Sequence, residues 1–133
     1  RDGFQVAALA LFQVTNDDEP GTIEDALAGA RAMLAFYIGG MGAKGQNYHT
    51  KLAARMGLGE QAERIQDLFL EGRGDEAVFE VPVEFADEIS LVGTPERIAD
   101  RVAAWKESAV TEILVAAGSV DQVRQAAEII LPV

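Results

Sequence analysis

Apolar positions near the start of the chain form an almost unbroken run. The run Phe4–Val14, FQVAALALFQV, lies between Gly3 and the polar turn TNDDEPG. Continuous apolar runs of this length are typical of a strand that is buried on both faces, as in a parallel sheet covered by helices. We therefore predict a strand over Phe4–Val14, although the alanines in the run would also permit a helix.

The next segment shows helical spacing. Thr22-x-x-Asp25 resembles a capping box, so we predict that Thr22 caps a helix. The helix is expected to run into Gly39-Gly40, where glycine can take the left-handed conformation that ends a helix. Its apolar face is predicted to consist of Ile23, Ala26, Leu27, Ala30, Leu34, Tyr37 and Ile38.

Three shorter segments follow in the middle of the chain. The pattern predicts helices over Asn47–Met56 and Glu60–Glu71, and each of them is followed directly by a glycine. The buried stripe of the second is predicted to be Ala62, Ile65, Leu68 and Phe69. In Asp75–Glu88, Pro82 breaks any helix, so we expect a helical start followed by an irregular VEFADEI.

The last third of the chain has the clearest pattern. Thr94 is predicted to cap the helix Pro95–Ala109, because proline is favoured at the first helical position. A short strand, Glu112–Ala116, follows, and Ser119-x-x-Gln122 forms a capping box that opens the last helix, Ser119–Leu131. Helix, strand and helix in this order indicate a helix-rich α/β protein with a parallel sheet.

Composition and charge exclude several classes of function. The chain has 133 residues, enough for one domain, and its net charge of −11 argues against nucleic acid or an anionic membrane as a partner. It has no cysteine, which excludes disulfides and zinc–thiolate sites. No apolar run approaches the roughly 20 residues of a membrane helix, and no signal peptide is visible, so we expect a cytoplasmic protein. Because the chain begins at Arg1 without a methionine, we also expect it to be a piece of a longer protein.

The segment GMGAKG, residues 40–45, matches the G-x-G-x-x-G fingerprint of dinucleotide-binding turns by letter. That fingerprint needs a strand before it and a helix that opens inside it, whereas these glycines follow a predicted helix. A phosphate-binding loop is also excluded, because Gln46 stands where that motif requires lysine. We therefore interpret the segment as a helix end and a loop, in which Lys44 is either solvated or close to an anion.

The remaining residues with possible chemical roles do not indicate a catalytic or metal site. His49 is the only histidine, so a paired-histidine metal site is absent, and its polar neighbours indicate a surface or helix-start residue. No pair of carboxylates is marked out for acid–base catalysis, so no catalytic residue and no metal ligand is predicted. Trp105 is in phase with Ile98 and Val102 and is expected in the core.

The strand end VAAGS, residues 115–119, is the one functional locus that general rules support. Ligands of parallel α/β sheets collect beyond the carboxyl ends of strands, and helix N-termini bind anions. Gly118 and Ser119 would offer backbone N–H groups there. The alternative is that these two residues only cap the following helix.

Two longer stretches resemble a known family. They are LAFYIGGMGAKGQNYHTKLAARMGLGEQAERIQDLFLEGR and VPVEFADEISLVGTPERIADRVAAWKESAVTEILVA. Together they resemble the C-terminal part of the luciferase-like monooxygenase family, in particular oxidoreductases that use coenzyme F-420 (8-hydroxy-5-deazaflavin). The segments Tyr37–Gly42 and Ser90–Glu96 are the most specific parts, and the resemblance covers nearly all of the chain.

The resemblance implies the C-terminal portion of a (β/α)₈ TIM barrel, with residues 1–133 as a single segment of that domain. Phe4–Val14 would be its strand seven and Glu112–Ala116 its strand eight. The helices from Ile23 to Glu88 would form a large insertion before the crossover helix Pro95–Ala109. Because two strands cannot close a barrel and strand edges would stay exposed, we expect homo-oligomers.

The resemblance also implies a function. The cofactor would be coenzyme F-420, with FMN as the alternative, and the reaction a hydride transfer to or from a small organic substrate. The barrel would place its site at Thr15, Asn16, Gly118 and Ser119, with Gly40, Met41, Gly42 and Lys44 on the substrate side. Catalytic residues would lie in preceding strands, so the chain alone is expected to be inactive. The alternatives are a non-catalytic acidic α/β interaction module and a piece of an FMN-dependent monooxygenase.

Overall fold

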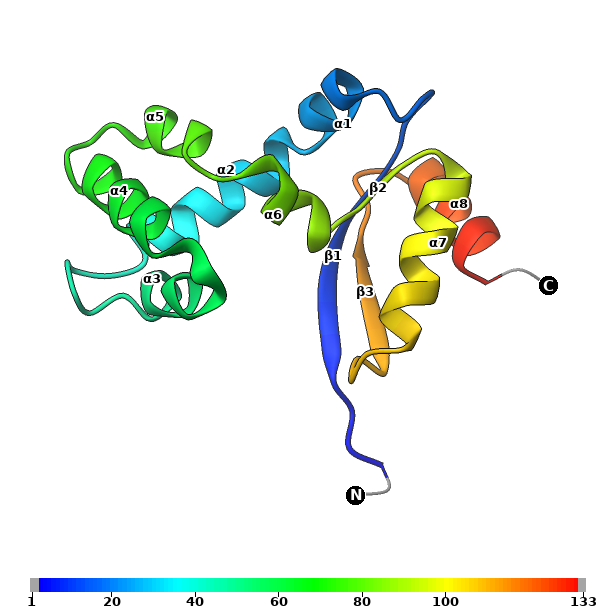
Figure 1. Ribbon diagram of the computed structural model, residues 1–133. Coiled ribbons are helices and arrows are strands. Elements are labelled where there is room, and N and C mark those ends of the chain that lie inside the picture. Colours follow the sequence, from blue (N-terminus) through cyan, green and yellow to red (C-terminus); the bar gives the residue numbers. More distant parts are fainter. Residues whose placement is uncertain (1–2, 132–133) are drawn as a thin grey trace. The chain divides into compact units, whose positions relative to one another are not determined.

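The predicted N-terminal strand is present as β1 (Ala7–Val14), the central strand of a three-stranded parallel sheet. In the computed structural model, which describes residues 3–131, the strand order is β2-β1-β3 (Figure 1). The predicted second strand is β3 (Glu112–Ala116), which pairs with β1 from Ala7↔Glu112 to Leu11↔Ala116. The strand β2 (Leu91–Gly93) pairs with the other end of β1 and was not predicted.

The described residues fall into two compact units. The first, which we call the sheet unit, comprises residues 3–27 and 89–131. The second, the helical unit, is Ala28–Glu88 and is inserted between β1 and β2. Within residues 3–131, no helix is both long and apolar enough to cross a membrane.

One face of the sheet carries the core of the sheet unit. The helices α7 (Pro95–Lys106) and α8 (Val120–Ile130) lie on this face (Figure 1). Alternate residues of β1, Ala10 and Phe12, point into the core, as the period of two in a strand requires. The buried cluster consists of Ala10, Phe12, Leu91, Ile98, Val102 and Ala126, with Trp105 packed against it as predicted.

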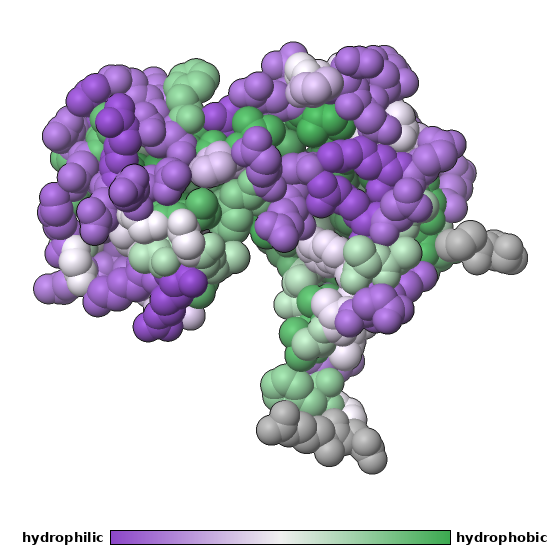
Figure 2. Space-filling view, viewed as in Figure 1, coloured by the Kyte–Doolittle hydropathy of each residue, from purple (hydrophilic) through white to green (hydrophobic). Residues whose placement is uncertain are grey.

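The opposite face of the sheet is apolar but exposed. Leu9 on β1 is 60% exposed and Leu114 on β3 is 53% exposed. Apolar (green) surface is visible over the lower part of β1 and β3 in Figure 2. The prediction of a strand that is buried on both faces is therefore wrong for the described residues: β1 is apolar on both faces, but only one face is covered.

Helix capping in the sheet unit follows the sequence at two of three places. The Thr94 side chain accepts a hydrogen bond from Arg97 N, and the Ser119 side chain accepts one from Gln122 N, so both predicted caps are confirmed. The predicted Thr22 cap is wrong. The helix α1 (Pro20–Ala26) begins with Pro20, which is preset for the first helical position, and Thr22 lies inside it.

The helical unit contains only helices among its regular elements. It consists of α2 (Ala28–Ala35), η1 (Phe36–Gly40), α3 (Tyr48–Ala53), η2 (Ala54–Leu58), α4 (Gly59–Leu70), α5 (Gly74–Phe79) and α6 (Val83–Glu88). The helix α6 corrects the prediction of an irregular segment after Pro82. Pro82 lies just before this helix, where its missing N–H costs nothing, and its carbonyl accepts a hydrogen bond from Ala86 N.

The core of the helical unit shows what the paired glycines do. Neither Gly39 nor Gly40 has a positive φ, so the prediction of a left-handed helix end there is wrong. A Cβ on Gly39 would lie 2.7 Å from Phe69 Cβ, so glycine is required because η1 packs directly on α4.

The predicted stop after the next helix is confirmed at Gly57, whose φ is 91°. The buried cluster comprises Ala35, Ile38, Ala53, Ala62, Ile65, Leu68, Ala77 and Val81.

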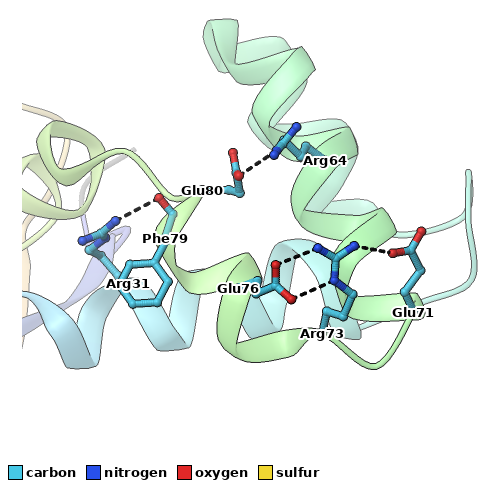
Figure 3. A network of polar contacts seen from close by, with 7 residues as sticks. All are labelled: Arg31, Arg64, Glu71, Arg73, Glu76, Phe79 and Glu80. Atoms are coloured by element: carbon cyan, nitrogen blue, oxygen red, sulfur yellow. Dashed lines mark hydrogen bonds and ion pairs between the residues drawn. The ribbon is translucent and has the colours of Figure 1, made fainter.

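Polar contacts around α5 complete this unit (Figure 3). The buried guanidinium of Arg31 on α2 donates to Val81 O at 3.1 Å and to Phe79 O at 3.0 Å. Arg73 at the start of α5 pairs with Glu76 at 2.6 Å, and this hydrogen bond lowers the pKa of the Glu76 carboxyl. Arg31 therefore fixes the end of α5 through backbone carbonyls, whereas the exposed pair contributes little.

Candidate functional site

The carboxyl end of β1 opens into a polar hollow. Thr15 N donates to Gly93 O at 2.9 Å, which continues the pairing with β2, and Thr15 Oγ1 donates to Asp17 O at 2.7 Å. The hollow has a volume of about 360 Å³ and is lined by Gln13, Val14, Thr15, Asn16, Thr22, Asp25 and Ala26. The structure thus brings the two predicted residues Thr15 and Asn16 together at one cavity.

The lining of this hollow determines which ligand groups it can hold. Gln13, Thr15, Asn16 and Thr22 supply neutral donors and acceptors, and Asp25 supplies one carboxylate. No lysine or arginine is among the lining residues in the described part of the chain. The hollow therefore suits hydroxyl and amide groups better than a phosphate.

The carboxylate of Asp18 fixes the turn after β1, in which Thr15 and Asn16 line the hollow. Asp18 Oδ1 accepts from Thr94 N at 2.8 Å, and Asp18 Oδ2 accepts from Thr94 Oγ1 at 2.7 Å. These two bonds hold the pKa of the Asp18 carboxyl below its ordinary value, and the charge of Arg97 acts in the same direction. Asp18 thereby sits at the N-terminus of α7, where the helix dipole favours negative charge.

Gly93 explains part of the Ser90–Glu96 segment. Its φ is 137°, a backbone conformation that residues other than glycine rarely adopt. A Cβ at this position would lie 2.8 Å from Asp18 Oδ1 and 2.6 Å from Arg97 Cδ. Glycine is therefore needed for β2 to turn into α7 beside Asp18. The sequence analysis did not identify the contact between Asp18 and the Gly93–Thr94 turn. Its two parts were visible separately, as an acidic turn after the first strand and as a Gly-Thr-Pro helix start about 75 positions later, but nothing in the sequence linked them.

At the carboxyl end of β3, the polar groups bond to the following helix and do not line the hollow at β1. Gly118 N donates to Gln122 Oε1, and Ser119 Oγ accepts from Gln122 N at 3.2 Å. Both groups thus serve the cap of α8, which is the simpler of the two readings that the sequence allowed. Gly118 and Ser119 are exposed, and neither is among the described residues that line the hollow at β1. Their role in cofactor binding stays a prediction.

The predicted substrate-side loop lies in the helical unit and is held against α4. Lys44 Nζ pairs with Asp67 Oδ1 at 2.6 Å, and this hydrogen bond raises the pKa of the Lys44 ammonium group. The buried side chain of Gln66 donates to Gly42 O and Ala43 O, each at 3.4 Å. Lys44 is therefore paired with a side chain of the protein itself. Met41 stays exposed, and the contact of Gly40, Met41, Gly42 and Lys44 with a substrate stays a prediction.

Asn47 organises the same region and was missed as a buried residue. It is 1% exposed, and its Nδ2 donates to Tyr37 O at 3.0 Å and to Ile38 O at 2.9 Å. Its Oδ1 accepts from His49 N at 2.8 Å and so caps α3. The signal in the sequence was an asparagine directly before a predicted helix. Its contacts to the end of η1 could not be read from spacing.

Comparison with known proteins gives the family. The model of the family described as luciferase-like monooxygenase matches residues 1–112. A Mycobacterium tuberculosis protein named "Putative coenzyme F-420-dependent oxidoreductase" is 35% identical over 130 residues, which are 98% of this chain. The chain spans 36% of the length of that relative. No solved structure matches the chain. The chain belongs to the luciferase-like monooxygenase family.

Proposed function

We propose that the chain forms the C-terminal part of an oxidoreductase that transfers a hydride between coenzyme F-420 and a small organic substrate. The observation that carries this proposal is the 35% identity, over 98% of the chain, to a protein named for dependence on that cofactor. Because the chain spans 36% of that relative, the proposal concerns a whole protein to which the chain contributes one part. In this proposal β1 and β3 are neighbouring strands of a (β/α)₈ barrel.

The hollow at the end of β1 supports a specific role for the chain. When bound, the deazaflavin ring supplies the hydride chemistry, and the protein binds and orients it. Asn16 and Thr15 would hydrogen-bond hydroxyl or amide groups of the cofactor, because the hollow offers neutral donors and acceptors. Asp18 would hold this wall in place through Thr94. FMN, which also carries hydroxyl and amide groups, remains the second candidate.

Cofactor titration tests this proposal. Fluorescence anisotropy of F-420, and in parallel that of FMN, is measured as the whole protein that contains this chain is added. We expect F-420 to bind more tightly than FMN, and Asn16→Ala to weaken binding about threefold or more through the loss of a hydrogen bond. Gln125→Ala is the matched control, because Gln125 is an exposed amide side chain on α8.

The outcomes separate the candidates. Tighter binding of FMN would replace F-420 by FMN in the proposal. If neither cofactor binds, or if Asn16→Ala and Gln125→Ala behave alike, a cofactor site on the β1 end is contradicted. Cytoplasmic location and homo-oligomers are part of the same proposal, and light scattering tests the second of these.

A further inference from the structure

The hollow at the carboxyl end of β1 contains polar side chains that the protein itself leaves without a partner. Within residues 3–131, four of the side chains that line it take part in no hydrogen bond or ion pair, namely those of Gln13, Asn16, Thr22 and Asp25. A concave site with a few unpaired polar groups is the usual form of a ligand site. These groups therefore indicate which chemical groups a ligand must bring.

Gln13 stands out because β1 is otherwise apolar. It is the only polar residue in the strand sequence AALALFQV. Its neighbour Phe12 is buried in the core, and successive side chains of a strand point to opposite faces. The Gln13 amide is therefore directed away from the core, and it lines the hollow half-buried. Packing of the core does not require an amide at this position.

Polar groups reach the hollow from two elements. Thr22 and Asp25 both belong to α1, and a separation of three positions places them on the same side of that helix. Gln13 and Asn16 come from β1 and from the turn that follows it. A ligand in the hollow thus meets two unpaired side chains from the helix and two from the strand end.

The unpaired groups favour hydroxyl groups as their partners. The amides of Gln13 and Asn16 and the hydroxyl of Thr22 can each donate and accept. The carboxylate of Asp25 only accepts, so its partner must be a donor. A hydroxyl group donates and accepts, so a row of hydroxyls satisfies all of these side chains. A carboxylate or a doubly ionised phosphate has no donor for Asp25 and would bring negative charge close to it.

Other chemical groups fit this lining less well. Among the described residues, no aromatic, lysine or arginine side chain lines the hollow, and its apolar lining consists of Val14 and Ala26. A planar ring would have no aromatic face to stack on. A cation would pair with Asp25 but would offer no acceptor to the N–H donors of the two amides. The volume of about 360 Å³ is at the lower end for ligand sites, so the hollow holds one part of a larger molecule.

We infer that the hollow binds a polyhydroxyl segment, a sugar or an open polyol chain, and that Asp25 selects it against anionic groups. The two residues of α1 and the two of the strand end bond to successive hydroxyls. F-420 and FMN each carry a polyol segment between the ring and the phosphate. The assignment of the hollow to that segment rests on the proposed function, whereas the binding of a polyol does not.

Free ribitol, an open-chain polyol with a hydroxyl on every carbon, tests the site directly. The control is pentane-1,5-diol, which has the same carbon chain but carries hydroxyls only at its ends. Saturation-transfer NMR measures the binding of each compound to the whole protein that contains this chain. We expect ribitol to bind about fivefold more tightly than the diol, because its inner hydroxyls meet the unpaired side chains.

Two neighbouring carboxylates on α1 give the matched variants. Asp25→Asn keeps the shape of the side chain but removes the charge. We expect it to weaken ribitol binding about fivefold, because hydrogen bonds to a charged acceptor are stronger than those to a neutral one. Glu24→Gln makes the same change of charge at an exposed residue outside the lining and should alter binding less than about twofold. Circular dichroism verifies that each variant is folded, and Thr22→Val replaces Asp25→Asn if the latter does not fold.

Inorganic phosphate separates selection by charge from a purely structural role of Asp25. Because the carboxylate repels anions, phosphate should compete with ribitol more strongly in Asp25→Asn than in the unsubstituted protein. A purely structural role would weaken the binding of both compounds alike, and that result would contradict the role of Asp25.

Several further results would overturn the inference. They are no detectable binding of ribitol, equal affinity for the diol, or equal effects of the two variants. Ribitol binding that depends on Asp25, without binding of F-420 or FMN, would leave the polyol site in place and contradict the proposed function. Binding of either cofactor with equal affinity in Asp25→Asn and Glu24→Gln would do the reverse.

Discussion

The two units differ in how completely they bury their apolar side chains. In the helical unit Ile65, Leu68 and Val81 are all buried by neighbouring helices. In the sheet unit Phe12 and Ala10 are buried, whereas Leu9, which precedes Ala10 on β1 and lies on the opposite face of the sheet, is 60% exposed. The difference shows that the helical unit supplies its own core, while the sheet unit leaves one apolar face of its sheet exposed, which we expect further protein to cover.

The length of the relative supports this interpretation. The chain spans 36% of that protein, so the larger part of that relative has no counterpart in this chain. Parallel sheets are almost always covered on both faces. The exposed face of β1 and β3 is therefore where we expect the rest of a barrel, or another copy of the chain, to pack.

The largest expected effect concerns the covered face of the sheet. Phe12→Ala removes a side chain that is 1% exposed and should lower the free energy of unfolding of the sheet unit by about 3–5 kcal/mol. Leu9→Ala, on the exposed face, should cost less than about 1 kcal/mol. The measurement is denaturant unfolding followed by Trp105, the only tryptophan, which lies in the sheet unit. Equal losses would mean that the exposed face is covered in solution.

A second substitution tests whether the helical unit unfolds independently of the sheet unit. Asn47→Ala removes a buried side chain that bonds to Tyr37 O, Ile38 O and His49 N, and should destabilise this unit by about 2–3 kcal/mol. Both tyrosines of the chain lie in this unit, so near-ultraviolet circular dichroism of tyrosine reports on it. The Trp105 transition should stay unchanged. A parallel shift of both transitions would show that the two units unfold together.

The third prediction concerns association. Leu9→Lys places a charge on the exposed face of the sheet and should reduce self-association, because an apolar sheet face with open strand edges favours contact with another copy. Light scattering measures the change in average mass. Lys51→Leu, on the exposed surface of α3, is the control in the helical unit. A monomeric unsubstituted protein would contradict the predicted homo-oligomers.

The smallest effect is the dependence of stability on pH. Thr94 lowers the pKa of Asp18 in the folded state, so the stabilisation is present above the ordinary value of 3.8 and is lost as the pH falls through the folded pKa. Trp105 unfolding curves over the acidic range should show this loss in the sheet unit. Asp18→Asn should remove it, whereas Asp100→Asn, an exposed carboxylate on α7, should not. An unchanged acidic slope in Asp18→Asn would refute the role of Asp18.

Local signals in the sequence predicted most of the elements. The caps at Thr94 and Ser119 and the stop at Gly57 depend on neighbouring residues only, and all three are confirmed. Thr22 failed because Pro20 is the stronger local signal for the start of a helix. The strand β2 was missed because three residues carry no periodicity and exist as a strand only through pairing with β1.

The candidate site could be predicted only in part for the same reason. Thr15 and Asn16 follow an obvious strand, so the rule for parallel sheets placed them at its carboxyl end. Asp18 and Gly93 act through a contact between distant segments, and Gly39 is required by the side chain of Phe69. Contacts of this kind depend on tertiary packing, which spacing along one chain does not reveal.

The pairing of β1 has a consequence for the order in which the protein forms during synthesis. Val6 N bonds to Thr111 Oγ1, 105 positions later, and Asp18 bonds to Thr94, 76 positions later. Contacts in the helical unit are shorter in sequence, such as Asn47 to Ile38 over 9 positions. The contacts within the helical unit can therefore form as that unit leaves the ribosome, whereas β1 gains its pairing with β2 only after residue 93 and its pairing with β3 only after residue 116 has emerged. During that interval β1 is the segment on which a chaperone would act.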